Sequence, residues 1–278
     1  MEDTSSPIVL RQPSAWRQYF LLLRAGLAVE LQYRGNFLLV LLGAVAYQGV
    51  SLAFVGVLAS QFGSIGGWGF SEVAFIYAIR MCAHGVMTIP LGQLWQTSEA
   101  VVSGEYDRYL LRPANPYLQL ITRRFALAAT GDIVLGVATL AVVSLVVSIH
   151  WTPLRVLYLV AAVVGGAAME AATLTFCAAL SFRFLSTYSL MSFYDSVYAS
   201  FGAYPLDALG KIISLVLTFI VPLAFIAYFP ATVLLSRTGE LTVPPWLAGI
   251  APAVGAAGYA AALWFFHRQT RHYTSSGH

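Results

Sequence analysis

Four ionisable residues interrupt the long apolar stretches of this sequence: Arg80, Asp132, Glu170 and Asp195. A charged side chain is costly inside a bilayer, so such residues usually face a bundle interior or a water-filled cavity. They could line a substrate path. They could equally hold the helices together as structural pairs, in which Arg80 would pair with Glu170 or Asp132. The residues alone leave both interpretations open.

The sequence lacks the motifs of common hydrolytic enzymes. Its single lysine, Lys211, follows no glycine-rich phosphate loop, so we do not expect this chain to hydrolyse ATP. It has neither the His-Glu-x-x-His pattern of zinc proteases nor the Gly-x-Ser-x-Gly turn of serine hydrolases. The five histidines are scattered or lie in the tail, and Cys82 and Cys177 have no ligand spacing. We therefore predict no catalytic residue, no metal and no cofactor in the chain itself.

A second group of charges lies between two apolar runs, in "GEYDRYLLRPANPYLQL" from residue 104 to 120. Residues 93–102 can form a short helix that Gly104 ends, as glycine often does. Pro113 stiffens the chain beyond it, because proline fixes its own φ angle. The alternative is a solvated loop of ordinary polar residues. The side chains that could contact a partner are Glu99, Glu105, Asp107 and Arg108.

The composition identifies an integral membrane protein. Of 278 residues, 59% are hydrophobic and only 10% are charged, unlike a soluble domain. Apolar runs of about 20 residues can cross a bilayer as helices, and the short apolar/polar alternation of an outer-membrane barrel is not seen. We predict an all-α protein with six transmembrane helices in a single transmembrane domain, residues 37–278. The predicted spans are about 37–60, 72–91, 125–149, 156–180, 185–204 and 246–266.

The fifth span is ambiguous in the sequence. Residues 185–204 are weakly hydrophobic and contain Asp195, whereas residues 207–235 are strongly apolar but contain Pro222 and Pro230. Either stretch could cross. The last span has small residues at four-residue steps, which predicts close approach of another helix along that stripe. The stripe consists of Gly249, Ala253, Ala257 and Ala261.

Residues 1–36 have the pattern of an amphipathic helix. Large apolar residues recur at three- and four-residue steps, with Arg17 and Arg24 on another side, which is typical of a helix lying in the membrane interface. A cytosolic helix packed on another element is the alternative. The apolar residues are Trp16, Phe20, Leu23, Leu27 and Leu31.

The basic residues predict the orientation. Short cytosolic loops carry an excess of lysine and arginine. With both termini in the cytosol, most of the 15 basic residues lie inside, and only Arg155, Lys211 and Arg237 need lie outside. This orientation places residues 93–117 in the cytosol. It also places Asp132 about two helical turns from the cytosolic Arg124, where Asp132 would need no special role.

The polar segment resembles a known family. "SEAVVSGEYDRYLLRPANPYLQLITRRF" is similar to the cytosolic connection between the second and third spans of bacterial ABC-2 type transporter permeases, which carries a Gly-x-x-Asp-x-x-Leu-x-x-Pro pattern. The matching residues are Gly104, Asp107, Leu110 and Pro113.

Two further stretches resemble the same family. The run "YPLDALGKIISLVLTFIVPLAFIAYFPATVLL" resembles the family's Tyr-Pro-Leu segment and its Pro-x-Ala-Phe-x-x-Tyr-x-Pro-Ala pattern, and "RHYTSSGH" resembles the family's Tyr-x-Ser-x-Gly ending. Gly210 and Lys211 depart from the family, which often has a proline and an aromatic residue there. The residues matching the longer pattern are Pro222, Ala224, Phe225, Tyr228, Pro230 and Ala231.

The resemblance implies the transmembrane subunit of an ATP-driven exporter in the bacterial inner membrane. Its implied partners are cytosolic ATPase subunits, which would bind ATP and Mg²⁺, a second permease, identical or sister, and membrane lipids; no nucleic acid is expected. The 93–117 segment would couple the permease to the ATPase. Residues 185–204 would then be the fifth span and residues 207–235 a re-entrant hairpin, with a kinked ordinary span as the alternative.

Two other classes compete with this interpretation. A secondary transporter or channel could use Arg80, Asp132 and Glu170 as an intramembrane ion or proton relay. A membrane scaffold would need no transport chemistry at all. Neither class accounts for the three stretches that resemble the permease family.

Overall fold

The computed structural model describes residues 17, 19–21, 23–24, 27–28, 34–123, 126, 128–184 and 186–273. Within these residues the chain is helical, and the one β pairing is an isolated bridge between Ile65 and Trp68. The predicted all-α class is confirmed. Most of the predicted interfacial helix over residues 1–36 lies outside the described residues, as do Arg124 and the tail after Tyr273.

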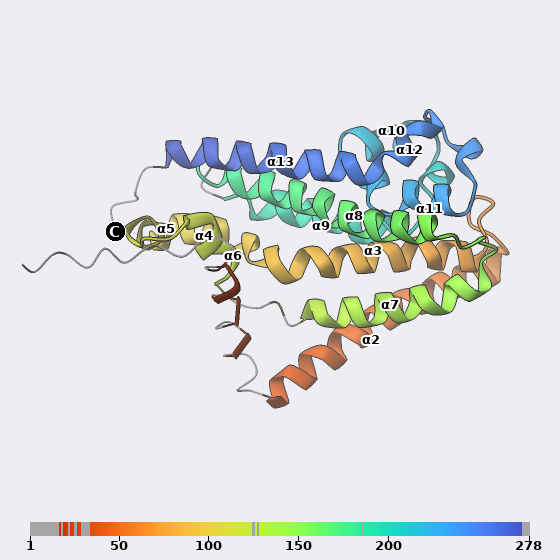
Figure 1. Ribbon diagram of the computed structural model, residues 1–278, viewed down its shortest axis with the longest axis horizontal. Helices are drawn as coiled ribbons and strands as arrows, with labels where there is room; N and C mark the ends of the chain where they lie inside the picture. Colours follow the sequence, from red (N-terminus) through yellow and green to blue (C-terminus); the bar gives the residue numbers. More distant parts are fainter. Residues whose placement is uncertain are drawn as a thin grey trace, which may run out of the picture.

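Long helices run roughly along the long axis of the molecule (Figure 1). They are α2 (Arg34–Phe62), α3 (Phe70–Leu91), α7 (Ala128–Val146), α8 (Pro153–Leu180) and α13 (Ala251–Gln269). A helix rises 1.5 Å per residue, so about 20 apolar residues cover the hydrocarbon of a bilayer. Among the described residues, four helical stretches are long and apolar enough to cross: Leu38–Val57, Phe70–Val102, Ala129–Val146 and Pro153–Leu180.

The two other predicted spans correspond to less typical helices. Helix α9 (Tyr188–Phe201) has 14 residues, fewer than a perpendicular crossing needs. Helix α13 has 19 residues, but its last turn carries His267, Arg268 and Gln269, which shorten its apolar part. The count of six spans therefore stays a prediction.

The 207–235 region forms short helices separated by turns. The chain passes through α10 (Lys211–Phe219), turns at Pro222, and continues through η3 (Leu223–Phe225) and α11 (Tyr228–Leu234). These helices gather with α12 (Pro245–Gly249) at one end of the molecule (Figure 1). Short 3₁₀ helices lie beside them, η2 (Leu206–Leu209) and η4 (Thr238–Glu240).

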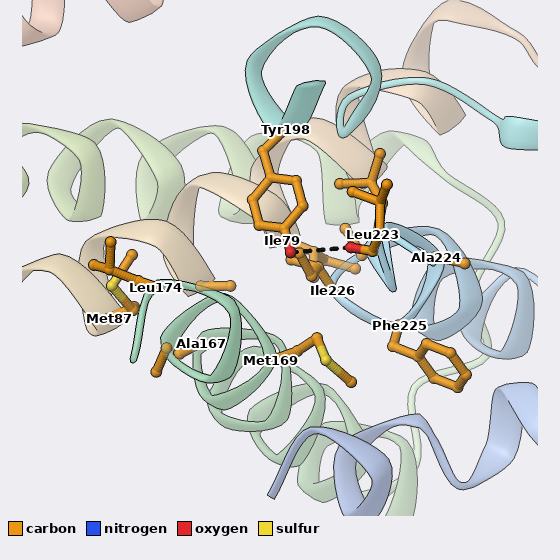
Figure 2. Packing of buried hydrophobic residues seen from close by; sticks show 14 of the residues in the cluster. Ile79, Met87, Ala167, Met169, Leu174, Tyr198, Leu223, Ala224, Phe225 and Ile226 are labelled. Atoms are coloured by element: carbon orange, nitrogen blue, oxygen red, sulfur yellow. Dashed lines mark hydrogen bonds between the residues drawn. The ribbon is translucent and has the colours of Figure 1, made fainter. Parts of the chain in front are cut away.

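The turn after Pro222 is enclosed by protein. Leu223 to Phe229 are all buried, and Figure 2 shows Phe225 and Ile226 beside the α8 helix. A Cβ atom added to Gly166 of α8 would lie 2.5 Å from the Ile226 carbonyl oxygen, so the backbones meet closely. Interrupted helices occur at membrane depth only where protein or water covers the freed backbone groups. This burial suits a re-entrant course, which itself stays a prediction.

Helices α8 and α13 pack through glycine. A Cβ atom added to Gly255 would lie 2.0 Å from the carbonyl oxygen of Gly165, so no larger residue fits there. The predicted small-residue stripe does not make this contact. Three of its members, Ala253, Ala257 and Ala261, are exposed, because the stripe lies on another face of α13 than Gly255.

The opposite end of the molecule holds the 93–117 segment (Figure 1). It comprises η1 (Gly92–Gln96), α4 (Thr97–Val102), α5 (Glu105–Leu111) and the start of α6 (Pro116–Ile121). Gly104 has a φ of 71°, a left-handed conformation that glycine adopts without strain, and it reverses the chain between α4 and α5. The short η5 helix (Thr270–His272) follows α13 at this same end.

Candidate functional site

The four ionisable residues predicted inside the bundle come from four helices. Arg80 lies on α3, Asp132 on α7, Glu170 on α8 and Asp195 on α9. Arg80, Asp132 and Glu170 are buried, whereas Asp195 is exposed. His84 joins them, because it follows Arg80 by four residues and therefore lies on the same side of α3.

Glu170 is bound by His84 and not by Arg80. The Nδ1 atom of His84 lies 2.9 Å from Oε2 of Glu170, so the two side chains share a hydrogen bond. Thr88 Oγ1 lies 3.4 Å from the other ring nitrogen of His84. The second carboxylate oxygen of Glu170, Oε1, is buried and has no hydrogen-bond partner among the described residues.

Asp132 is bound by a glutamine that is not among the predicted site residues. Gln48 of α2 donates from Nε2 to Asp132 Oδ1 at 2.7 Å. The Tyr77 hydroxyl, on α3, lies 2.7 Å from Gln48 Oε1 and donates to it. This chain of hydrogen bonds joins α2, α3 and α7. Gln48 could have been noticed in the sequence as an amide within an apolar run.

Arg80 pairs with neither predicted acid within the described part of the chain. Its Nε atom is buried without a hydrogen-bond partner there. The side chain packs on Gly202, the residue after α9, where an added Cβ atom would lie 2.7 Å from Nε. The relay of the alternative prediction is not continuous here, because Asp132 is bonded towards α2 and Glu170 towards His84.

A small cavity lies between α3, α8 and α9. It has a volume of about 40 Å³, and its lining includes His84, Glu170 and Asp195 together with Trp95 and Tyr194. Of the four predicted intramembrane residues, Glu170 and Asp195 thus come together, and Arg80 and Asp132 lie elsewhere. Within the described residues, no cluster of histidine, cysteine and acidic side chains could hold a metal ion.

The 93–117 segment is anchored by aromatic packing. Tyr106 is 1% exposed and packs edge-on against Phe182 and Tyr273, with ring centroids 4.9 and 5.1 Å away. Burial, and the nearby Asp107 carboxylate, raise the pKa of Tyr273 to about 12. This aromatic group fixes α5 against the ends of α8 and α13.

Polar contacts close the same segment. Arg123 Nη2 lies 2.9 Å from Glu105 Oε2, and the Tyr109 hydroxyl donates to Glu105 Oε1 at 3.2 Å. Gln119 donates from Nε2 to the carbonyl oxygens of Tyr109 and Ala114, each at 3.0 Å. The turn between α5 and α6 is therefore held as one unit with α5.

The outer surface of this unit mixes charge with exposed leucine. Of the predicted coupling residues, Glu99, Arg108 and Pro113 are exposed, whereas Gly104, Glu105 and Asp107 are half-buried. Leu111 is 85% exposed, and Leu110 and Val102 are exposed as well. The charged residues were predicted from the sequence to contact a partner. Leu111 and Val102 were not, and Leu110 was noted only as part of the family pattern. We call Val102, Arg108, Leu110, Leu111 and Arg112 the α5 face.

Arg237 joins several elements at the other end of the molecule. It lies 2.7 Å from Glu72, at the start of α3, and 2.7 Å from Glu240. Its guanidinium also stacks on the Trp68 ring, 4.2 Å from the centroid. Glu240, and then Glu72, raise the pKa of Arg237 above its usual value, so the residue stays charged. It ties the 63–69 loop and α3 to the short helices of this end.

These features define an all-helical, multi-pass membrane protein with one compact polar end. The family model described as ABC-2 family transporter protein matches residues 45–277, and the chain belongs to that family. No curated protein and no solved structure matches the chain. Membership identifies a permease subunit of an ABC transporter, a class in which a separate subunit is the ATPase.

Proposed function

We propose that this chain is the permease of an ATP-driven exporter in the bacterial inner membrane, and that the ATPase subunit acts on it through the 93–117 segment. ATP and Mg²⁺ bind to the ATPase subunit. The observation that carries the proposal is the α5 face, where Leu111 is exposed on an end that the arginine bias assigns to the cytosol. An apolar patch rimmed by charge on a water-facing end is typical of a protein interface.

The anchoring of α5 supports a mechanical role. A permease without a nucleotide site must receive the ATP cycle as a movement, and a movement is transmitted only by a rigid part. Tyr106 and the Glu105–Arg123 pair fix α5 to the ends of α8, α13 and the chain leading to α7. A push on the α5 face would therefore move those helices together.

Orientation and span number are part of the same proposal. Both termini are cytosolic, α9 and α13 complete six spans with the four strongly apolar helices, and residues 207–235 enter the membrane from outside and return. The burial of Leu223 to Phe229 supports the re-entrant course, because it covers the backbone groups that the broken helix frees. Export as the direction rests on the three stretches that resemble exporter permeases.

A second permease, identical or sister, covers the outward side of α9. Ser192 is half-buried and Ser196 and Ser200 are exposed on this helix. Serine side chains are small and polar, so they suit close contact between membrane helices better than contact with lipid tails. Lipid surrounds the remaining apolar faces, such as that of α2.

The test is to place a charge on the α5 face. Leu111→Asp should abolish most co-purification of the partner ATPase subunit, and with it ATP-driven transport. Leu154→Asp is the matched control, because Leu154 is 75% exposed at the opposite end. Normal ATPase co-purification and transport with a well-folded Leu111→Asp protein would reject the proposal.

A further inference from the structure

The cavity between α3, α8 and α9 contains a carboxyl group with one unsatisfied oxygen. Glu170 is 2% exposed and lines the cavity. His84 satisfies Oε2 at 2.9 Å, but Oε1 has no partner among the described residues. A buried carboxylate oxygen without a partner costs free energy. Such a group indicates a site that a ligand completes.

The hydroxyl groups of the cavity use their protons within the protein. Tyr198 donates to the Val221 carbonyl oxygen at 3.0 Å (Figure 2). Thr173 Oγ1 lies 2.7 Å from the Tyr198 oxygen and 3.3 Å from the Met169 carbonyl oxygen, so one of these two groups takes its single proton. In either case at least one lone pair of Thr173 Oγ1 is left as an acceptor. Glu170, Thr173 and Asp195 thus line the cavity as acceptors.

We infer that this cavity binds the primary ammonium group of an amphipathic amine. An ammonium group carries three donors, which matches three acceptors from Glu170, Thr173 and Asp195. The rings of Trp95 and Tyr194 also line the site and favour a cation through their π faces. Arg80, although on the same helix as His84, does not line the cavity.

The hydrogen-bond donors select the head group. The cavity has a volume of about 40 Å³, which is enough for a small polar group. A primary ammonium group offers three N–H donors to the three acceptors. A trimethylammonium group has no N–H and would leave all three acceptors without a donor.

An adjoining groove selects the rest of the ligand. It has a volume of about 440 Å³ and shares Thr173 and Tyr194 with the cavity. Its other lining residues are mainly apolar, including Phe176, Trp264 and Phe265. Phe176 and Trp264 are exposed on the side that would face lipid, so an alkyl chain dissolved in the bilayer can reach the groove. The ligand class is therefore a lipophilic primary amine.

This inference concerns binding, and only the further step that the bound amine is the transported substrate rests on the proposed function. The binding test uses the full-length permease purified without an ATPase, so its failure would leave ATP coupling untouched. Radiolabelled n-octylamine is equilibrated by dialysis against the protein in maltoside micelles, with empty micelles subtracted. Saturable binding is expected, and neither n-octanol nor octyltrimethylammonium should displace the amine.

Variants locate the site. Glu170→Gln should weaken octylamine binding by roughly tenfold or more, which is the usual loss for a hydrogen bond to a charged group. Asp195→Asn, at an exposed position, should weaken it by a smaller factor. Asp132→Asn is the matched control, because Asp132 is a buried acid bonded to Gln48 and does not line the cavity.

Binding of the three octyl compounds is compared on the protein with its natural sequence. This comparison therefore stays decisive even where a variant fails to fold. Binding that is equal for the amine, the alcohol and the trimethylammonium compound would overturn the inference. Full octylamine affinity in a folded Glu170→Gln protein would overturn it as well.

Discussion

The guanidinium Nη2 of Arg123 lies 2.9 Å from the Oε2 atom of Glu105, so α5 is tied to the chain that leads into α7. Both side chains are partly exposed, and such pairs contribute less than about 1 kcal/mol to stability. The importance of this pair therefore lies in the position that it gives α5 and not in the free energy of folding.

Reversal of one charge of the pair should uncouple the transporter without unfolding it. We expect Arg123→Glu to fold and to bind the ATPase, yet to lose most ATP-driven transport in proteoliposomes, because α5 is repelled from its support. The double variant Glu105→Arg with Arg123→Glu restores opposite charges and should recover transport. Unchanged transport by the single variant would show that the pair has no positioning role.

Tyr106 should be essential for the fold of the polar end. Tyr106→Ala removes a fully buried ring from Phe182 and Tyr273, and such truncations cost about 3 to 5 kcal/mol. We expect a clear drop in melting temperature and loss of ATPase co-purification. Tyr106→Phe keeps the ring and should stay close to the natural chain in both measurements; equal behaviour of the alanine variant would contradict the anchoring.

Glycine at position 255 should be required for helix packing. A Cβ atom there would lie 2.0 Å from the Gly165 carbonyl oxygen, whereas a Cβ atom on Gly249 meets nothing within 4 Å. Gly255→Ala should destabilise the protein by about 1 to 3 kcal/mol through overpacking, and Gly249→Ala should not. Thermal unfolding of the two purified variants compares them directly; similar melting temperatures would show that α8 and α13 do not meet here.

Loss of Arg237 should loosen the end that carries α10 to α12. We expect Arg237→Ala to speed amide hydrogen exchange in residues 63–69 and 236–243, which this side chain joins. Arg237→Lys should rescue little, because an ammonium group cannot reproduce the forked contacts to Glu72 and Glu240. Exchange at Glu105 to Leu111, at the far end, is the internal control and should not change.

Much of the helical layout could be predicted from the sequence. The positions of the long helices could be predicted from the apolar runs, because the length and composition of a segment decide whether it is stable in lipid. Turns could also be predicted from single residues. Gly104 was expected to end a helix, and its φ of 71° is a conformation that glycine adopts without strain. The number of spans is harder to predict. Whether a 14-residue helix such as α9 crosses the membrane depends on its tilt and on the helices beside it.

Contacts between helices could not be predicted in the same way. Charge alone offered Glu170 and Asp132 as possible partners of Arg80. The residue that reaches Glu170 is His84, one turn further along α3. The small-residue stripe of α13 likewise gave the right kind of contact on the wrong face, since α8 meets Gly255. Which side of a helix meets which neighbour depends on packing of the whole bundle.

The contact between the α5 face and an ATPase can be measured directly in cells. A photo-crosslinking phenylalanine derivative is introduced at Leu111 and, as a control, at Leu154, two exposed leucines at opposite ends. Irradiation should join the Leu111 variant, and not the Leu154 variant, to the ATPase subunit identified by mass spectrometry. Absence of an ATPase adduct at position 111, in cells that make the complete transporter, would contradict the proposed coupling.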